Sequence, residues 1–340
     1  MKISKTELIK ALDIVKPGLA TSDNIDQGTS FAFMENRIVT YNDSVSISTP
    51  FQSDVIGAVS AKELYVLLNK IDKKIDNINI RQDNGELLIG IGKGESAGIK
   101  LVEDIQLPLD EVNTKHHWKK IPSDLIKALL FCSFSTTKDL SKPLLTCVHV
   151  KNDIVESTDN KRGTDYKLKS EVNGEFLIPV DSIKHLRNFN PTKYSLTDSW
   201  VSFLAENKTI FSCRILKEKF PNISSIMDVT GKKMKFPDGI VDAIDKAVIF
   251  CEEEESLAGT MVDIKLTKNL IIIKGENGVG HYTKKTKIKY IGDTFMFSVS
   301  SKFFTDMLKI TDTCYLDKDN HKIKFSCDSW NHMFRLTPEK

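Results

Sequence analysis

An amphipathic helix pattern returns three times along the chain at a fixed spacing. Its clearest copy is residues 60–71, where apolar side chains recur at i, i+3, i+4 and i+7, one face of an α-helix: Leu64, Leu67, Leu68 and Ile71. Ser60 and Glu63 form a capping box at its start. Similar segments lie at 179–189 and 298–310, so Ser60, Val180 and Ser300 mark steps of about 120 residues. A period of this length predicts an internal domain repeat.

A second helix pattern has nearly the same spacing. It begins at Ser4, Pro122 and Pro237, which gives steps of about 118 and 115 residues. Short alternating or apolar runs follow, and we predict strands for them at 30–34, 37–41, 44–49, 78–81, 86–91, 98–102, 144–150, 153–158, 201–204, 209–215, 261–266, 269–274, 314–317, 322–327 and 332–336. A polar turn recurs after the second strand of each unit, at Asn42-Asp43, Asp159-Asn160 and Glu276-Asn277.

These patterns predict an α+β fold of three repeated domains, each with two helices packed on antiparallel strands. The basic segments 116–122 and 232–237 both end in proline, as linkers can. We therefore place the domains at 1–115, 116–230 and 231–340. Sheet edges and helix faces of such units can continue from one unit to the next.

Composition narrows the class of protein. The 340 residues have a formal net charge of +2, and no apolar run approaches the roughly 20 residues that span a bilayer. The charged start at residues 1–7 does not resemble a signal peptide. Six cysteines without a CxxC pair indicate reduced, buried thiols. We expect a cytoplasmic protein with no membrane contact.

Two local motifs make the chain resemble the bacterial sliding clamp, the beta subunit of DNA polymerase III. Residues 157–162, Ser-Thr-Asp-Asn-Lys-Arg, are similar to the Ala-Thr-Asp-Gly-His-Arg segment of that family. Residues 211–221 resemble the strand and Phe-Pro turn that close its second domain. The resemblance covers the whole chain and includes the threefold repeat. Divergence of the units fits a phage or mobile-element version.

The resemblance implies a DNA clamp architecture, in which a head-to-tail homodimer closes into a ring of six domains. Such a ring encircles double-stranded DNA without sequence preference and tethers a DNA polymerase. A clamp loader opens and closes it. The chain is then a processivity factor for DNA replication and not an enzyme, with no catalytic residue, cofactor or metal of its own.

Lysine and arginine side chains on or beside the predicted helices suit a DNA channel, because phosphate contacts carry no base information. The candidates are Lys10, Lys70, Lys73, Lys74, Lys127, Lys138, Lys142, Lys184, Arg187, Lys246, Lys302 and Lys309. The alternative is that they form ordinary solvated helix faces. The acidic run Glu252 to Glu255 departs from a channel lining and is left without a role.

The resemblance also implies an apolar pocket for short partner peptides between the second and third domains. Carried over by position, it comprises Leu145, Thr158, Asn160, Arg162, Pro221, Ile226, Phe334, Leu336 and Pro338. Asn160 stands where the family has glycine, and asparagine tolerates the left-handed backbone. Lys161 replaces histidine, and the C-terminal segment 333–340 departs from the family pattern. Without the resemblance, 157–163 is a polar turn, and Phe334 and Leu336 belong to a core-facing edge strand.

Three competing interpretations are weaker. The glycines of 90–96 lack the spacing of a phosphate-binding loop, which favours a hairpin tip. Adjacent His116 and His117 point in different directions and make a poor metal pair. No Ser–His–Asp or Cys–His arrangement supports an enzyme. The main alternative to a clamp is a clamp-fold scaffold that binds peptides but does not load on DNA.

Overall fold

The computed structural model describes residues 1–22, 24–92, 94–252 and 260–338. It contains two compact units, which we call unit 1 (1–126 and 172–218) and unit 2 (127–171 and 219–340). Both units combine helices with antiparallel sheets, which confirms the predicted α+β class. The predicted second domain contributes to both units, and the three-domain boundaries stay a prediction.

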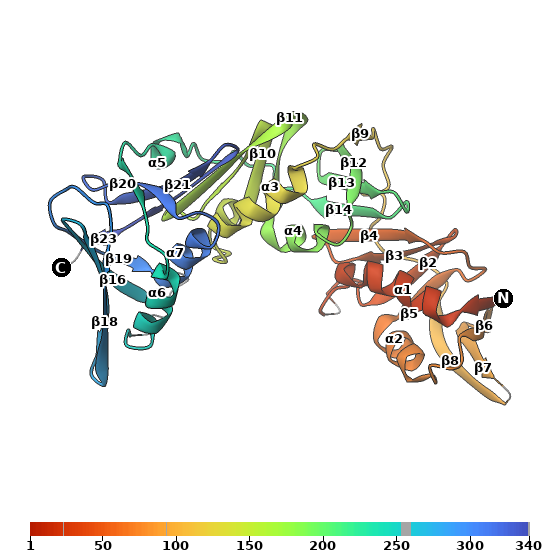
Figure 1. Ribbon diagram of the computed structural model, residues 1–340. Helices are drawn as coiled ribbons and strands as arrows, with labels where there is room; N and C mark the ends of the chain where they lie inside the picture. Colours follow the sequence, from red (N-terminus) through yellow and green to blue (C-terminus); the bar gives the residue numbers. More distant parts are fainter. Residues whose placement is uncertain (23, 93, 253–259, 339–340) are drawn as a thin grey trace. The chain divides into compact units, whose positions relative to one another are not determined.

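Unit 1 is built on one twelve-stranded sheet (Figure 1). All its strand pairs with a resolved register are antiparallel. In spatial order the strands are β1 (Lys2–Ser4), β6 (Asn77–Asp83), β7 (Glu86–Gly92), β8 (Glu95–Val102), β5 (Gly57–Ser60), β2 (Ser30–Met34), β3 (Arg37–Tyr41), β4 (Val45–Pro50), β14 (Ile210–Arg214), β13 (Trp200–Ala205), β12 (Pro191–Leu196) and β9 (Lys119–Lys120).

The helices of unit 1 are α1 (Lys5–Val15), α2 (Ala61–Lys70) and α4 (Val180–Leu186), with a 3-10 turn at Lys16–Gly18. The Ser4 hydroxyl oxygen caps α1 by accepting the Glu7 N–H at 3.1 Å. At the start of α2 the Ser60 hydroxyl instead donates to the Glu63 carboxylate, so only the side chains of the expected capping box meet. The apolar faces of α1 and α2 are buried, and the two helices pack together (Figure 1).

Unit 2 contains two sheets. The six-stranded one has the order β10 (Cys147–Thr158), β11 (Arg162–Pro179, of which 172–179 belong to unit 1), β22 (Trp330–Arg335), β21 (Lys322–Cys327), β20 (Thr313–Asp317) and β15 (Lys232–Lys235). The five-stranded one has the order β18 (Gly280–Lys287), β17 (Leu270–Asn277), β16 (Met261–Thr267), β19 (Phe295–Ser300) and β23 (Thr337–Pro338).

Four α-helices and two 3-10 turns complete the described part of unit 2. They are α3 (Leu125–Cys132, whose first two residues belong to unit 1), α5 (Ser224–Met227), α6 (Ile240–Val248) and α7 (Ser301–Leu308), with 3-10 turns at Ser133–Ser135 and Pro143–Thr146. The helices α6 and α7 pack together, as α1 and α2 do. All six repeat helices therefore form where the apolar periodicity places them.

Some strands differ from the sequence prediction. The two strands expected at 144–150 and 153–158 are one strand, β10, preceded by a 3-10 turn. Asn152 lies inside β10 with a φ of +53°, a left-handed conformation that asparagine tolerates, so the polar pair Lys151-Asn152 does not end the strand. Nine of the described strands were not predicted, namely β1, β5, β9, β11, β12, β15, β18, β19 and β23.

Two strand pairings join segments far apart in the sequence, and we name them junctions. In the first junction, β4 pairs with β14, with Val45 opposite Cys213 and Ser48 opposite Ile210. In the second junction, β11 pairs with β22, with Arg162 opposite Phe334. Because β22 lies between β11 and β21, it is an interior strand and not the edge strand that the sequence allowed.

A polar turn of one design precedes both junctions and also β18. In each copy a side-chain oxygen accepts the backbone N–H groups two and three residues further on, at 2.7–3.2 Å. The three acceptors and their donors are Asn42 with Ser44 and Val45, Asp159 with Lys161 and Arg162, and Asn277 with Val279 and Gly280. The turn makes Val45, Arg162 and Gly280 equivalent positions, each opening a strand.

Candidate functional site

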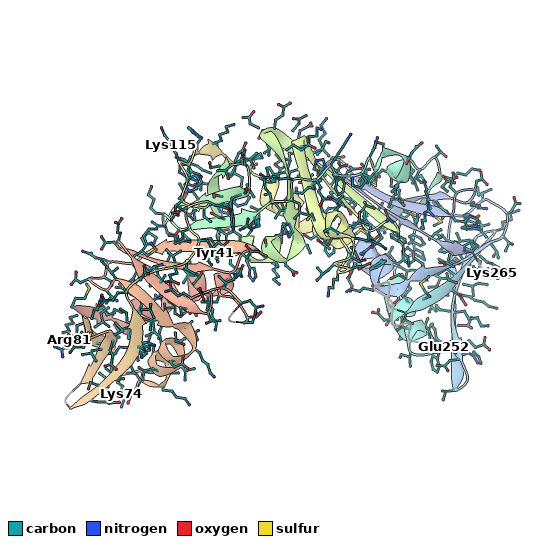
Figure 2. All side chains as sticks on the ribbon, turned by 180° about the vertical axis from the view of Figure 1, so that it is seen from behind. Tyr41, Lys74, Arg81, Lys115, Glu252 and Lys265 are labelled. Carbon is teal, nitrogen blue, oxygen red and sulfur yellow. The ribbon has the colours of Figure 1, made fainter. Side chains whose placement is uncertain are left out.

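The twelve candidate DNA-channel residues are all exposed. Unit 1 carries Lys10, Lys70, Lys73, Lys74, Lys184 and Arg187, and unit 2 carries Lys127, Lys138, Lys142, Lys246, Lys302 and Lys309. Figure 2 shows Lys74 at the surface of unit 1. Three of the twelve form ion pairs with a carboxylate on their own segment: Lys142 with Asp139 at 3.6 Å, Lys184 with Asp181 at 3.1 Å and Lys246 with Asp242 at 2.8 Å.

These ion pairs are weak restraints. All six side chains are more than 40% exposed, and exposed pairs contribute at most about 1 kcal/mol. A DNA phosphate could therefore displace the carboxylate at little cost. Exposure fits both a DNA-facing surface and a solvated helix face, so the channel assignment stays a prediction.

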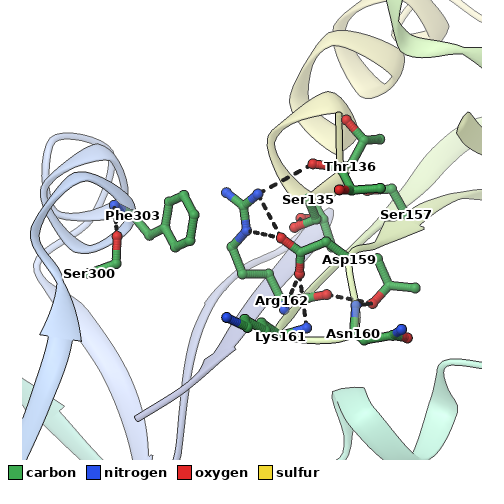
Figure 3. A network of polar contacts seen from close by, with 12 residues as sticks. Ser135, Thr136, Ser157, Asp159, Asn160, Lys161, Arg162, Ser300 and Phe303 are labelled. Carbon is green, nitrogen blue, oxygen red and sulfur yellow. Dashed lines mark hydrogen bonds and ion pairs between the residues drawn. The ribbon is translucent and has the colours of Figure 1, made fainter. Parts of the chain in front are cut away.

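The turn that opens β11 holds a nearly buried ion pair, shown in Figure 3. Arg162 Nε donates to Asp159 Oδ2 at 2.9 Å, and Nη2 lies 2.8 Å from the same oxygen. The other carboxylate oxygen accepts the N–H groups of Lys161 and Arg162, and Nη2 also donates to the Thr136 carbonyl oxygen at 3.4 Å. Both charged side chains are only 10% exposed, so the turn is fixed by a satisfied, desolvated pair.

Phe303 of α7 covers the Arg162 guanidinium. The guanidinium carbon lies 3.5 Å from the ring centre, within the range of a cation–π contact (Figure 3). Burial lowers the pKa of Arg162, and the charges of Asp159 and Asp306 oppose this effect. An arginine keeps its charge despite such a shift, so Arg162 stays positively charged within this network.

The nine predicted pocket residues all lie in unit 2 but differ in exposure. Five are buried, namely Leu145, Thr158, Arg162, Phe334 and Leu336. Three are exposed, namely Asn160, Pro221 and Pro338, and Ile226 is half-buried. Asn160 has the expected left-handed backbone, with a φ of +71°. The described surface therefore offers four of the nine side chains to a peptide, and the pocket stays a prediction.

A buried network of polar side chains beside the second junction was not predicted from the sequence. The Thr164 hydroxyl lies 2.7 Å from His332 Nδ1 and 2.6 Å from the Ser135 hydroxyl. Burial lowers the pKa of His332 to about 3, with a smaller effect of the Arg162 charge. His332 is therefore neutral at physiological pH. Its partners lie 168 and 197 residues away in sequence, so spacing could not reveal them.

Other candidate features add no chemistry. Among the residues that the structure describes, no group of three or more His, Cys, Asp or Glu side chains could hold a metal ion. The segment 90–96 belongs to the hairpin of β7 and β8, apart from residue 93, which lies outside the described residues. Residues Glu253 to Glu255 of the acidic run also lie outside them. No helix of the described chain is long and apolar enough to cross a membrane.

This architecture is the fold of bacterial DNA sliding clamps. No protein-family model matches the sequence, and a search of curated proteins finds no match. Solved structures, in contrast, match the chain from end to end. Sequence identity below 20% explains why a comparison of structures detects what the sequence searches do not.

Three clamp structures illustrate the likeness. The DNA polymerase III subunit beta from Pseudomonas aeruginosa has a TM-score of 0.83 at 15% identity, with 99% of both chains covered. The sliding clamp from Bacillus subtilis has a TM-score of 0.83 at 17% identity, covering 100% of this chain and 99% of its own. The DNA polymerase III beta chain from Streptococcus pneumoniae has a TM-score of 0.85 at 14% identity, with 99% of both chains covered.

Proposed function

We propose that the chain is a DNA sliding clamp, which encircles duplex DNA as a head-to-tail homodimer and tethers a DNA polymerase. The observation that carries this proposal is the clamp fold over nearly the whole chain. The protein would act as a processivity subunit without a catalytic site, and a clamp loader would place it on DNA. The role as a processivity subunit and the action of a clamp loader both rest on the likeness to the clamp structures.

The two junctions within the chain support a third one between chains. Each junction joins the strand after a polar turn to a strand of the following repeat. The third strand of this kind, β18, is an edge strand that pairs only with β17 in the described part of the chain. The counterpart of β14 and β22 in the first repeat is β8, whose described residues 95–100 pair only with β7. A second copy of the chain can therefore supply the missing neighbour of each edge.

The register of the existing junctions predicts the new one. Val45 pairs with Cys213 and Arg162 pairs with Phe334, and both partners precede an arginine. Gly280 is the equivalent of Val45 and Arg162, and Ile99, which precedes Lys100, is the equivalent of Cys213 and Phe334. Antiparallel pairing from Gly280 and Ile99 then brings Lys284 opposite Glu95 of the second copy. Opposite charges across strands favour this register.

Exposed lysines suit the proposed DNA contact. A sliding surface needs attraction that is weak, independent of sequence and reduced by salt, which phosphate contacts provide. The twelve cations have this exposure, and the fixed Asp159–Arg162 turn would support the peptide site of partner proteins. Asn160, Pro221, Ile226 and Pro338 would then form the accessible side of that site.

The test uses the purified full chain, a clamp loader and a nicked circular DNA. We expect a particle of two chains in solution, retention on the closed circle after loading, and release once the circle is cut. A control incubation without loader should leave the circle bare. Binding to polymerase peptides with no dependence on DNA topology would overturn the clamp proposal in favour of a peptide-binding scaffold.

A further inference from the structure

Tyr315 lies on the face of β20 that helix α7 does not cover. Its neighbours in the strand, Cys314 and Leu316, are buried at 0% and 5% exposure, whereas Tyr315 itself is only half-buried. Cys314 lies opposite Phe325 of β21, and the Phe325 ring packs against Phe304 of α7 at 6.1 Å between centres. Because successive side chains of a strand point to opposite faces, Tyr315 points away from α7.

Lysine side chains surround Tyr315 on this face of the sheet. Lys233 of β15 and Lys324 of β21 lie directly opposite Tyr315, one on each side. Lys235 is a diagonal neighbour, two residues after Lys233 on β15. Side chains in these positions are about 5 Å apart when directly opposite and about 7–8 Å apart on the diagonal. We call Tyr315, Lys233, Lys235 and Lys324 the Tyr315 patch.

The three lysines of the patch are available to an anion. Lys233 and Lys324 form no ion pair within the part of the chain that the structure describes, and the Lys324 ammonium lies 5.9 Å from the centre of the Tyr315 ring. Lys235 pairs with Asp312 at 3.1 Å, but the two side chains are 71% and 47% exposed. An exposed pair of this kind is a weak restraint, so an incoming anion displaces the carboxylate easily.

Other charged groups on the same face already have partners. Lys322 Nζ donates to the carbonyl oxygens of Ser225 and Asp228, at 3.1 and 3.3 Å. The buried Asp317 carboxylate accepts the backbone N–H of Asn320 at 3.1 Å and its side-chain amide at 3.0 Å. The patch therefore combines an aromatic ring with three cations that are not held by buried groups.

We propose that the Tyr315 patch binds a single strand of nucleic acid, with one base stacked on the tyrosine ring and the flanking phosphates on the three lysines. An unpaired base presents an aromatic face beside a charged backbone, which matches both parts of the patch. A duplex is no ligand for the patch, because its bases are already stacked on one another. An acidic peptide would use the lysines but not the ring.

This site does not rest on the proposed clamp function, since it needs neither a closed ring nor a duplex. The DNA channel and the peptide pocket proposed above contain none of its residues. It adds a contact for an unpaired strand on a surface of unit 2 to which no other role is given.

The experiment measures binding of labelled single strands to the full-length chain by fluorescence anisotropy. Decathymidylate is compared with a ten-residue abasic strand, which has the same phosphates but no bases. We expect the native chain to prefer decathymidylate by about 5–150-fold, the value of one stacked base. Decauridylate is measured in parallel, and a similar preference over an abasic RNA strand would extend the site to RNA.

Substitutions separate the ring from the charges. Tyr315→Ala should reduce the preference for bases to about onefold, whereas Tyr315→Phe keeps the ring and should preserve it. Lys233→Ala together with Lys324→Ala should make the slope of log K against log salt concentration shallower by about 1.4, which is about 0.7 for each phosphate contact on a single strand. The matched control, Lys167→Ala with Lys219→Ala, removes two exposed lysines elsewhere in unit 2 and should keep the native slope.

Equal affinity of the native chain for decathymidylate and the abasic strand would overturn the proposal. A preference that Tyr315→Ala and Tyr315→Leu leave unchanged would do the same, and Tyr315→Leu keeps this test decisive if Tyr315→Ala fails to fold. Tighter binding of deca-glutamate than of decathymidylate would assign the lysines to an acidic peptide instead. Because no loader, circle or dimer is involved, failure here would leave the clamp proposal intact.

Discussion

The Arg162 guanidinium is held between the Asp159 carboxylate, at 2.8 Å, and the Phe303 ring, whose centre lies 3.5 Å from the guanidinium carbon. One side chain thus links the turn between β10 and β11 to helix α7, more than 130 residues further along the chain. At the first junction the equivalent Val45 cannot make either contact. The two junctions therefore have the same kind of strand pairing. Among the described residues, only the second junction has an arginine side chain that links the polar turn to the neighbouring helix.

We expect Arg162→Ala to lower the free energy of unfolding by about 3–5 kcal/mol, because it leaves the Asp159 carboxylate nearly buried without its partner. Arg162→Lys should recover only part of this loss, since an ammonium group cannot reproduce the planar guanidinium contacts. Denaturant unfolding monitored by circular dichroism measures both. Lys246→Ala, which breaks an exposed ion pair, should change the free energy of unfolding very little. Similar losses for Arg162→Ala and Lys246→Ala would contradict the role given to the buried pair.

The helices could be predicted from the sequence because their buried apolar residues recur with the period of an α-helix. Leu8, Leu12, Leu64 and Leu68 are all nearly inaccessible, as the apolar stripes of α1 and α2 require. The Asx turns were also visible, since an Asn or Asp side chain in a short polar stretch forms its bonds locally. Both features depend on neighbours in sequence and on no distant contact.

Features that depend on distant contacts could not be predicted in the same way. Strand β18 carries Lys284, Lys285 and Lys287 and lacks apolar alternation, because it is an exposed edge. The pocket prediction took Phe334 and Leu336 as partner contacts, but both are buried, at 2% and 3% exposure. Phe334 packs between Phe304 and Phe325, which come from elements whose proximity the sequence pattern does not reveal.

His332 should make the stability of the protein depend on pH. Its pKa is about 3 in the folded chain and about 6.5 in an unfolded one, so below pH 6.5 the unfolded state binds a proton that the folded state does not. Unfolding therefore becomes easier as the pH falls, by about 2 kcal/mol between pH 6.5 and pH 5 from this residue. We expect His332→Gln to remove this part of the decline in urea titrations at several pH values. Parallel slopes for native protein and His332→Gln would be incompatible with a neutral buried imidazole.

Replacing Lys70, Lys73 and Lys74 together by alanine should weaken binding to a short DNA duplex. If each lysine contacts a phosphate, the slope of log K against log salt concentration should become shallower by about 2–3. Fluorescence anisotropy between low and moderate salt gives this slope. The control removes the same charge at Lys232, Lys233 and Lys289, which line a cavity of unit 2. An equal change of slope in the control would show that net charge matters and not these three positions.

Charge reversal at the proposed contact between chains tests both the dimer and its register. Lys284 lies on β18 and Glu95 on β8, and both are exposed in the single chain. In the proposed pairing of Gly280 with Ile99, Lys284 of one chain faces Glu95 of the other. A dimer has two such interfaces, so it contains this contact twice. Either Lys284→Glu or Glu95→Lys alone would place like charges opposite each other, which is unfavourable across paired strands.

We expect each single variant to weaken the dimer and the double variant Lys284→Glu with Glu95→Lys to restore most of the loss. A cross-strand pair contributes roughly 0.2–1 kcal/mol, and two copies per dimer double the effect, so the dissociation constant should change by about 2–30-fold. Sedimentation velocity over a dilution series measures it. Lys285→Glu provides the matched control, because the neighbouring side chain on a strand points to the opposite face and does not meet Glu95. If Lys285→Glu is rescued by Glu95→Lys while Lys284→Glu is not, the strands pair one residue out of the proposed register. If no variant changes the mass distribution, β18 and β8 do not form the contact.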